Sequence, residues 1–302
     1  MSLEGVYGAP PAALAASGPA AIQLSPLVPG AADIETLADG SLQRAVIAAP
    51  PGALERRYAL AHALRVLAIG GALVALAPKD RGGARLHKEL AAFGCAVEET
   101  ARRHQRICQV RRAAEPLGLK AAIEAGGPQW VEALGLWSQP GVFSWDRLDP
   151  GSALLIDKAP AFSGRGADLG CGIGVLARAV LAEPAVSELS LIDIDRRAVA
   201  AAARNIDDAR ARFAQKDIRV PDLGLSGLDF VIMNPPFHGG GREDRGLGPA
   251  FIAAAADMLR KGGVCRLVDN VALPYEAALA RQFSSVTLLR REGGYKVLEA
   301  RL

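Results

Sequence analysis

Residues 167–176 have the sequence ADLGCGIGVL, in which an apolar run leads into alternating glycines and then resumes. This order predicts a strand, a tight turn and a helix, because glycine permits left-handed backbone and leaves room for a ligand close to the chain. The glycines are Gly170, Gly172 and Gly174, and Asp168 precedes the first of them by two positions. Its carboxylate would repel a phosphate ligand, whereas a ligand that carries an ammonium group would be attracted.

A second acidic pair, Asp193 and Asp195, ends the segment LSLIDID about 20 residues beyond the loop. A carboxylate at the end of the next strand can accept both hydroxyls of an adenosine ribose. We assign this role to Asp193, with Asp195 as a helix cap, although both aspartates could be caps. Asp217 is placed to accept from an adenine amino group, and a simple turn aspartate fits there as well. S-adenosylmethionine combines an adenosine with an ammonium group and is the cofactor we predict.

Residues 230–238 have the sequence FVIMNPPFH. An apolar strand here delivers Asn234 at its carboxyl end, the edge of a parallel sheet where ligands bind. The two prolines that follow fix φ and lack amide donors, so their carbonyls are held rigidly. Phe237 offers a ring to stack on a planar base, and His238 either contacts the substrate or simply lies on the loop. An ordinary Asn-Pro turn is the alternative, and the strand and the glycine loop upstream argue against it.

This loop suits methyl transfer to an amino group. The lone pair of a purine amino group is delocalised into the ring, which makes the nitrogen a poor nucleophile. Hydrogen bonds to the Asn234 side-chain oxygen and the Pro235 carbonyl would favour a pyramidal nitrogen and stabilise the developing positive charge. We therefore expect Asn234, Pro235 and Phe237 to be catalytic, with Phe237 and His238 contacting the substrate. The base would have to be splayed out of any helix to reach them.

Apolar runs of strand length alternate with helical patterns on both sides of these motifs, which is typical of an α/β fold. In the second half we expect helices from 151, 175 and 197 and over 249–259, strands at 166–169, 188–192, 212–215, 228–233 and 264–268, and a closing antiparallel pair. In the first half we expect strands at 45–49 and 72–77, helices at 53–67 and 83–93, a turn at Gly70-Gly71, and a strand pair within 97–110. A short helix could lie between Gly126-Gly127-Pro128 and Pro140-Gly141. The second half matches the class I methyltransferase variant of the doubly wound, Rossmann-like fold, mostly parallel with an antiparallel C-terminal strand.

The two halves share an internal repeat. The segment VIAAPP at 46–51 corresponds to VIMNPP at 231–236, and VLAIGG at 66–71 corresponds to MLRKGG at 258–263. Coincidence between two alanine-rich segments is the alternative. We interpret the repeat as a shortened, degenerate copy of the same fold over 1–124, without a cofactor site because Ala49 replaces Asn234 and no glycine-rich loop precedes it. Residues 125–302 form the catalytic domain in this interpretation.

These motifs permit a comparison with a known family. The second half resembles the ribosomal RNA guanine-N2 methyltransferases of the RsmC and RlmG type. The segments that carry the resemblance beyond the two motifs are GVFS at 141–144, LDPGS at 148–152, LPY at 273–275 and YKV at 295–297. The resemblance covers about residues 141–302 and implies methylation of guanine N2 in ribosomal RNA, with the small subunit favoured. It also implies ribosomal RNA or a ribosomal subunit as the partner, and a non-catalytic, methyltransferase-like N-terminal domain.

Composition sets further limits. The chain has 302 residues, enough for two domains, and a formal net charge of +3, too small to indicate nucleic acid by itself. The four cysteines are scattered without ligand-like spacing, so we expect no metal site and a reducing, cytoplasmic environment. No signal peptide and no apolar run of membrane-spanning length are evident, so we expect no membrane partner. The sequence carries no signal for an oligomeric state.

Three other functions share some of these features. Methylation of a protein glutamine or of DNA adenine also uses an Asn-Pro-Pro-aromatic loop, often with tyrosine, whereas this chain has Phe237. A catalytically silent RNA-binding relative would not need the intact motifs of the second half. A dinucleotide-dependent oxidoreductase would explain the glycine loop and the strand-end acid, but it leaves Asn234 and the two prolines unexplained.

Overall fold

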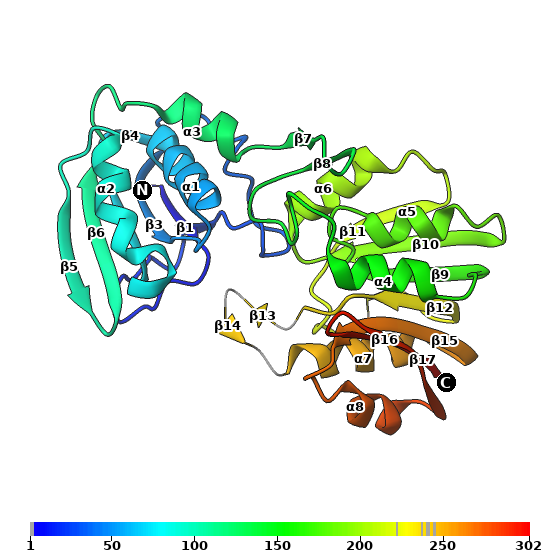
Figure 1. The fold of residues 1–302 in the computed structure, drawn as a ribbon. Helices are drawn as coiled ribbons and strands as arrows, with labels where there is room; N and C mark the ends of the chain where they lie inside the picture. The colour runs from blue at the N-terminus through cyan, green and yellow to red at the C-terminus, as the bar shows by residue number, and fades with distance from the viewer. Residues whose placement is uncertain (1–2, 222, 237, 240–241, 244–245) are drawn as a thin grey trace. The chain divides into compact units, whose positions relative to one another are not determined.

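The computed structural model of the chain describes residues 3–221, 223–236, 238–239, 242–243 and 246–302, with the backbone alone at 238–239 and 242–243. The chain divides into two compact units (Figure 1). The first unit comprises Met1–Gln129 with Gln139–Gly141, and the second comprises Trp130–Ser138 with Val142–Leu302. No helix in the described parts of the chain is long and apolar enough to cross a membrane.

A seven-stranded sheet in the order β11-β10-β9-β12-β15-β17-β16 forms the centre of the described second unit. The strands from β11 to β15 are parallel, and β17 pairs antiparallel with both β15 and β16. The bounds are β9 Gly164–Leu169, β10 Val186–Asp193, β11 Ala211–Gln215, β12 Leu228–Met233, β15 Leu259–Asn270, β16 Ser285–Glu292 and β17 Tyr295–Arg301. This topology confirms the predicted fold class.

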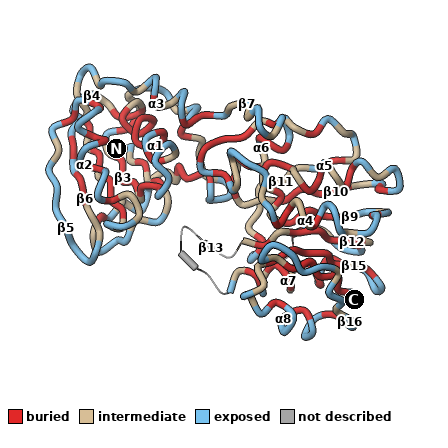
Figure 2. Tube along the Cα trace, in the orientation of Figure 1, coloured by how far each residue is buried: buried red, intermediate tan, exposed pale blue. Residues whose placement is uncertain are grey.

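Helices cover both faces of this sheet. They are α4 Pro150–Lys158, α5 Val175–Leu181, α6 Arg196–Asn205, α7 Leu247–Met258 and α8 Tyr275–Gln282. Alternate residues of β12 point to opposite faces: Val231 and Met233 pack with α7 and α8, and Phe230 and Ile232 pack with α4 and α5. The central strands are therefore apolar on both sides, as strands between two helical layers must be, and Figure 2 shows them as the buried centre of the unit.

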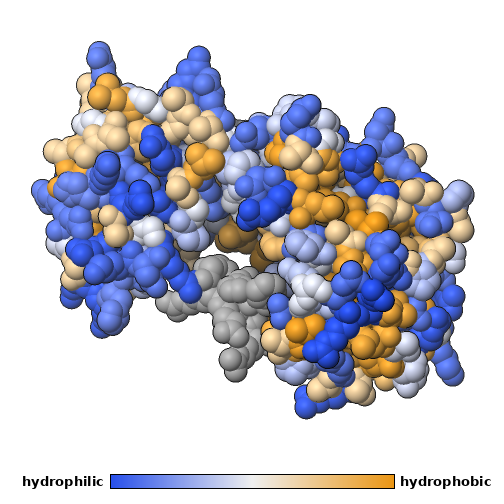
Figure 3. Space-filling view, in the orientation of Figure 1, coloured by the Kyte–Doolittle hydropathy of each residue, from blue (hydrophilic) through white to orange (hydrophobic). Residues whose placement is uncertain are grey.

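The first unit contains a sheet in the order β2-β1-β3-β4-β6-β5. Its elements are β1 Glu4–Tyr7, β2 Ile22–Gln23, β3 Leu42–Ala48, α1 Ala53–Val66, β4 Leu67–Pro78, the irregular turn η1 Lys79–Gly83, α2 Ala84–Ala92, β5 Glu98–Arg102, β6 Gln105–Arg111 and α3 Leu119–Gly126. The edge strand β5 is exposed along its length, and hydrophilic side chains predominate on the visible face of this unit (Figure 3). Its charged residues protect the open edge from pairing with other chains.

Backbone details confirm the internal repeat. The order β3-β4-β6-β5 repeats β12-β15-β17-β16 with the same strand directions. Gly70 and Gly262 occupy equivalent bulges with φ of 75° and 78°. Their amides donate to Arg112 and Leu302, respectively, at equivalent places on the neighbouring chain. The predicted turn at Gly70-Gly71 is therefore wrong, because Leu67 already pairs with Leu42 and the glycines lie inside β4.

The first copy is shortened at its beginning. Strands β1 and β2 pair in parallel, as β9 and β10 do, but residues 8–21 and 24–41 contain no helix where the second unit has α5 and α6. Val6 pairs with Val46 as Asp168 pairs with Ile232, so a valine replaces the aspartate. Val46 and Ile232 are equivalent because each pairs with the residue four positions beyond its glycine bulge, Val74 and Arg266, respectively. In this register Ala48 takes the place of Asn234, so the predicted match of Ala49 with Asn234 is wrong by one residue, and β3 has one additional residue before its prolines.

Arg56 of α1 occupies the region beyond β3. Its guanidinium donates to the carbonyls of Pro50 and Pro51 at 3.2 and 2.7 Å and pairs with both carboxylate oxygens of Glu89 at 2.7 Å. The arginine side chain is only 2% exposed. The carbonyls of the proline pair in the first copy thus accept hydrogen bonds from the guanidinium of Arg56.

A second difference from the sequence expectation concerns residues 129–138. The short helix expected between Gly127 and Pro140 is wrong: residues there form the hairpin strands β7 Gln129–Val131 and β8 Leu136–Ser138. Gly135 takes a left-handed φ of 59° in the turn, and the rings of Trp130 and Trp137 meet edge to face at 6.3 Å. A glycine turn and a cross-strand aromatic pair favour the hairpin over a helix.

We expect Arg56→Met to lower the free energy of unfolding by about 3–5 kcal/mol, because it leaves the Glu89 carboxylate buried without its partner. Urea unfolding followed by circular dichroism measures the change. The double variant Arg56→Met/Glu89→Leu is the matched control and should recover most of the loss. A single variant as stable as the wild type would contradict this account of the buried pair.

Candidate active site

The glycine loop joins β9 to α5 through a tight turn with left-handed backbone. Gly170, Gly172 and Gly174 all have left-handed φ, at 73°, 53° and 87°. A side chain at Gly174 would collide with Ile206 at 2.8 Å, whereas a Cβ at Gly172 would meet nothing within 4 Å. Gly174 is favoured chiefly by its left-handed φ, and Gly172 leaves open space beside the backbone where a ligand can approach.

Asp168 is fully buried at the end of β9. Among the described residues no hydrogen bond reaches either carboxylate oxygen, and only the amide of Ala177 is near enough to lower the pKa slightly. Burial, and to a lesser extent the charge of Asp193, raise the pKa of Asp168 to about 8. A buried carboxylate without a partner costs stability, and a cationic group bound beside it would remove that cost. The chemistry of this carboxylate fits the ammonium group of S-adenosylmethionine, but Asp168 does not line the pocket described below, so the contact stays a prediction.

The two strand-end aspartates have different partners. Asp193 ends β10 and accepts from the amides of Gly172 and Asp195, both at 2.9 Å. Its burial raises its pKa to about 6. Asp195 caps α6 by accepting from the Arg197 amide and pairs with the Arg197 guanidinium, which confirms its expected place as a cap. Asp193 is thus the carboxylate held against the glycine loop.

Asp217 lies in the turn after β11. Its carboxylate accepts from the amide and the guanidinium of Arg219 at 2.9 and 2.7 Å, and these bonds lower its pKa. It does not line the pocket described below. Its assignment to an adenine amino group stays a prediction.

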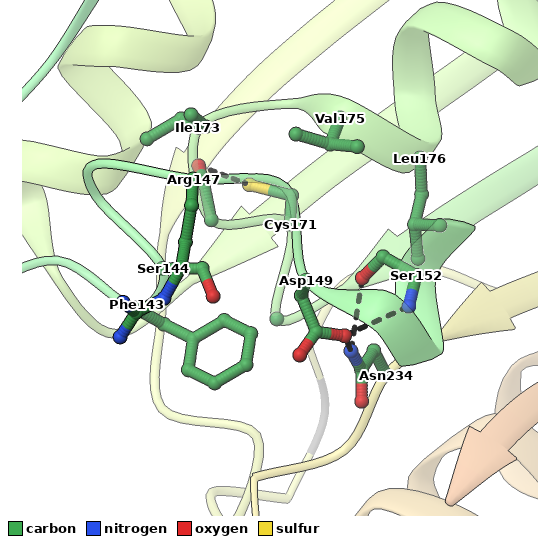
Figure 4. A pocket seen from close by; sticks show the side chains of 12 residues that line it. Phe143, Ser144, Arg147, Asp149, Ser152, Cys171, Ile173, Val175, Leu176 and Asn234 are labelled. Atoms are coloured by element: carbon green, nitrogen blue, oxygen red, sulfur yellow. Dashed lines mark hydrogen bonds between the residues drawn. The ribbon is translucent and has the colours of Figure 1, made fainter. Parts of the chain in front are cut away.

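Asn234 follows β12 at the same edge of the sheet as the glycine loop, because Met233 pairs with Leu169. Its side-chain amide nitrogen donates to Asp149 at 2.8 Å and to Ser152 at 2.9 Å. Figure 4 shows this nitrogen turned toward the two partners and the amide oxygen turned away from Asp149. Pro235 is buried beside it.

Asn234 and the glycine loop line one pocket (Figure 4). The segment that leads into α4 supplies further lining residues, which the motif analysis did not assign to the site: Phe143, Ser144, Arg147, Asp149 and Ser152. The Asp-Pro pair at 149–150 is a recognisable helix start, yet nothing in the local sequence signals contact with a residue 85 positions away. The resemblance of the segments 141–144 and 148–152 to known methyltransferases was the available signal.

Two expected site residues stay untested by the geometry. Phe237 lies outside the described residues. His238 is described by its backbone, which pairs with Glu243 in the ladder of β13 His238–Gly239 and β14 Arg242–Glu243. Stacking by Phe237 and substrate contact by His238 remain predictions.

Comparisons with known proteins agree with the fold and identify the family. The family model for the methyltransferase small domain matches residues 133–299, which defines the class as a methyltransferase. The ribosomal RNA small subunit methyltransferases C of Pseudomonas paraeruginosa and Pseudomonas aeruginosa are 34% and 32% identical, and each alignment covers 92% of this chain and 85% of the relative. The chain belongs to the ribosomal RNA small subunit methyltransferase C family.

A solved structure matches the chain over its full length. The T. thermophilus 16S rRNA N2 G1207 methyltransferase RsmC, in complex with AdoMet and guanosine, superposes with a TM-score of 0.80 at 25% identity. The match covers 100% of this chain and 88% of that one. Both units are therefore features of the family.

Asp168→Asn should stabilise the cofactor-free protein and weaken its binding of S-adenosylmethionine. The carboxyl pKa is raised from 3.8 to about 8 in the folded state, so ionisation costs stability progressively as pH rises between these values. The melting temperature of the variant should accordingly exceed that of the wild type by more at pH 9 than at pH 5. Scanning calorimetry and titration calorimetry measure the two effects. An advantage that shrinks with rising pH would contradict the assignment.

Proposed function

We propose that this protein transfers a methyl group from S-adenosylmethionine to the exocyclic N2 of a guanine in small-subunit ribosomal RNA. The observation that carries the proposal is the pocket shared by the glycine loop and Asn234, with the asparagine oxygen turned away from Asp149 as the acceptor for an amino group. Membership of the family and the guanosine-bound T. thermophilus relative support guanine N2 as the target. Ribosomal RNA or an assembling subunit is the partner in this proposal, and the cytoplasm its location.

The cofactor site consists of residues at the carboxyl ends of β9 and β10. Asp168 attracts the ammonium group, Asp193 accepts from the ribose hydroxyls, and Asp217 accepts from the adenine amino group. Gly170, Gly172 and Gly174 let the backbone approach the ligand. The bound cofactor supplies an electrophilic methyl group, so the protein need only hold the nucleophile in line with it.

The Asn234 oxygen and the Pro235 carbonyl accept the two hydrogens of the guanine amino group. This draws the nitrogen toward a pyramidal geometry and stabilises the charge that develops on it. Phe237 stacks on the splayed-out base and His238 contacts it or its flanking nucleotides. These two hydrogen bonds form before transfer and become stronger as positive charge develops on the nitrogen. They therefore stabilise the transition state more than the bound substrate, which accelerates the reaction.

The first unit, residues 1–124 in our assignment, binds no cofactor. Val6 replaces Asp168 in register, and the guanidinium of Arg56 donates to the carbonyls of Pro50 and Pro51, the proline pair of this unit. Catalysis in this proposal belongs to residues 125–302 alone.

Asn234→Ala should abolish transfer to ribosomal RNA while the Kd for S-adenosylmethionine changes little. Loss of a single oriented polar group at such a site costs about 100- to 1000-fold in rate. The assay follows labelled methyl groups into separated ribosomal RNAs, subunits, genomic DNA and protein extract, and titration calorimetry checks cofactor binding. Retained turnover in the variant would remove Asn234 from the mechanism. If the wild-type protein labels DNA or protein instead of RNA, the methyl acceptor is adenine in DNA or glutamine in protein.

A further inference from the structure

The orientation of the Asn234 amide is set by two residues outside the motif. Its nitrogen carries two hydrogens, and both have an acceptor: a carboxylate oxygen of Asp149 at 2.8 Å and the hydroxyl of Ser152 at 2.9 Å. The same Asp149 oxygen accepts from the Ser152 amide at 2.8 Å as the cap of α4. The helix start therefore holds the carboxylate in place, and the carboxylate holds the amide.

This arrangement distinguishes the two ends of the Asn234 amide. A carboxylate accepts hydrogen bonds and cannot donate them, so the reversed amide would place its oxygen against another oxygen. The reversed amide would also lose both hydrogen bonds that its nitrogen now donates, to Asp149 and to the buried Ser152 hydroxyl. The amide oxygen is consequently fixed on the side away from Asp149, as Figure 4 shows, where it lines the pocket.

We propose that Asp149 and Ser152 are positioning residues that fix Asn234 with its oxygen toward the substrate, so that the site selects a hydrogen-bond donor. An amino group satisfies this oxygen, whereas a ring carbonyl presented at the same point would be repelled. The bond to a charged acceptor also polarises the amide and strengthens its oxygen as an acceptor. This inference rests on the proposed function, because it assumes that Asn234 contacts the methyl acceptor.

A spectroscopic test needs no methyl acceptor. The chain has only three asparagines, Asn205, Asn234 and Asn270, so their side-chain signals in a 15N-asparagine sample can be assigned by substitution. Asn205 is the internal reference because its nitrogen donates to the carbonyls of Trp137 and Ile173. We expect slow proton exchange for the side chains of Asn205 and Asn234, and at least about 10-fold faster exchange for Asn234 in Asp149→Ser. Serine caps a helix as well as aspartate does but is too short to hold the amide.

Fast exchange of Asn234 in the wild type, or unchanged exchange in Asp149→Ser, would overturn the proposal whatever the substrate is. A wild-type protein that methylates no RNA would instead count against the proposed function, and the exchange measurement would still decide the positioning. The two failures are therefore distinguishable.

Kinetics give the second readout. Asp149→Ser should lower kcat by about 10- to 100-fold, the usual effect of losing a supporting residue, with the Kd for S-adenosylmethionine within about twofold of wild type. A weakened Kd with unchanged kcat at saturating cofactor would assign Asp149 to cofactor binding and overturn the proposal.

A reciprocal exchange tests the pairing itself. Asn234→Asp alone would set two carboxylates against each other and should nearly abolish transfer. Adding Asp149→Asn restores a donor to the pair and leaves an acceptor oxygen facing the pocket. The double variant should be at least about 10-fold more active than Asn234→Asp, and equal activity would overturn the proposal.

Discussion

The parallel pairing of β9 with β12 is the constraint on which the site depends. Met233 lies beside Leu169, so the residues that follow both strands emerge together at one edge of the sheet. One strand continues into the glycine loop and the other into Asn234-Pro235-Pro236. The apolar side chains of β12 pack against helices on both faces, which fixes this register, since a slip of one residue would exchange the two faces. Strand pairing and the packing that fixes its register thus bring the glycine loop and Asn234 together.

Most of this edge could be predicted from local sequence. Glycines that need left-handed backbone, an acid ahead of them and an apolar strand that ends in Asn-Pro-Pro each carry their own signal. The copy of the fold in the first half could also be predicted, because its glycine pair keeps its place and its proline pair is shifted by only one residue. The contact of Asn234 with Asp149 and Ser152 could not, because it joins residues 85 and 82 positions apart through ordinary polar side chains. The hairpin at 129–138 was missed for a similar reason: its aromatic pair forms only once the chain has turned.

The two copies show what separates a methyltransferase site from its scaffold. Both have parallel strands that lead to a pair of prolines and a glycine bulge in the next strand. In the first unit a buried arginine satisfies the proline carbonyls and a valine replaces the aspartate. In the second unit a buried carboxylate without a hydrogen-bond partner among the described residues is retained at a cost in stability. Such a cost is expected where a group serves a ligand rather than the fold.

The measurement that tests the central claim most directly is the identity of the methylated product. Small ribosomal subunits are incubated with the protein and labelled S-adenosylmethionine, and the extracted RNA is digested to nucleosides and analysed by mass spectrometry. The account predicts that the label is recovered as N2-methylguanosine. Label recovered as N6-methyladenosine, or only on a ring carbon or a ribose oxygen, would contradict it.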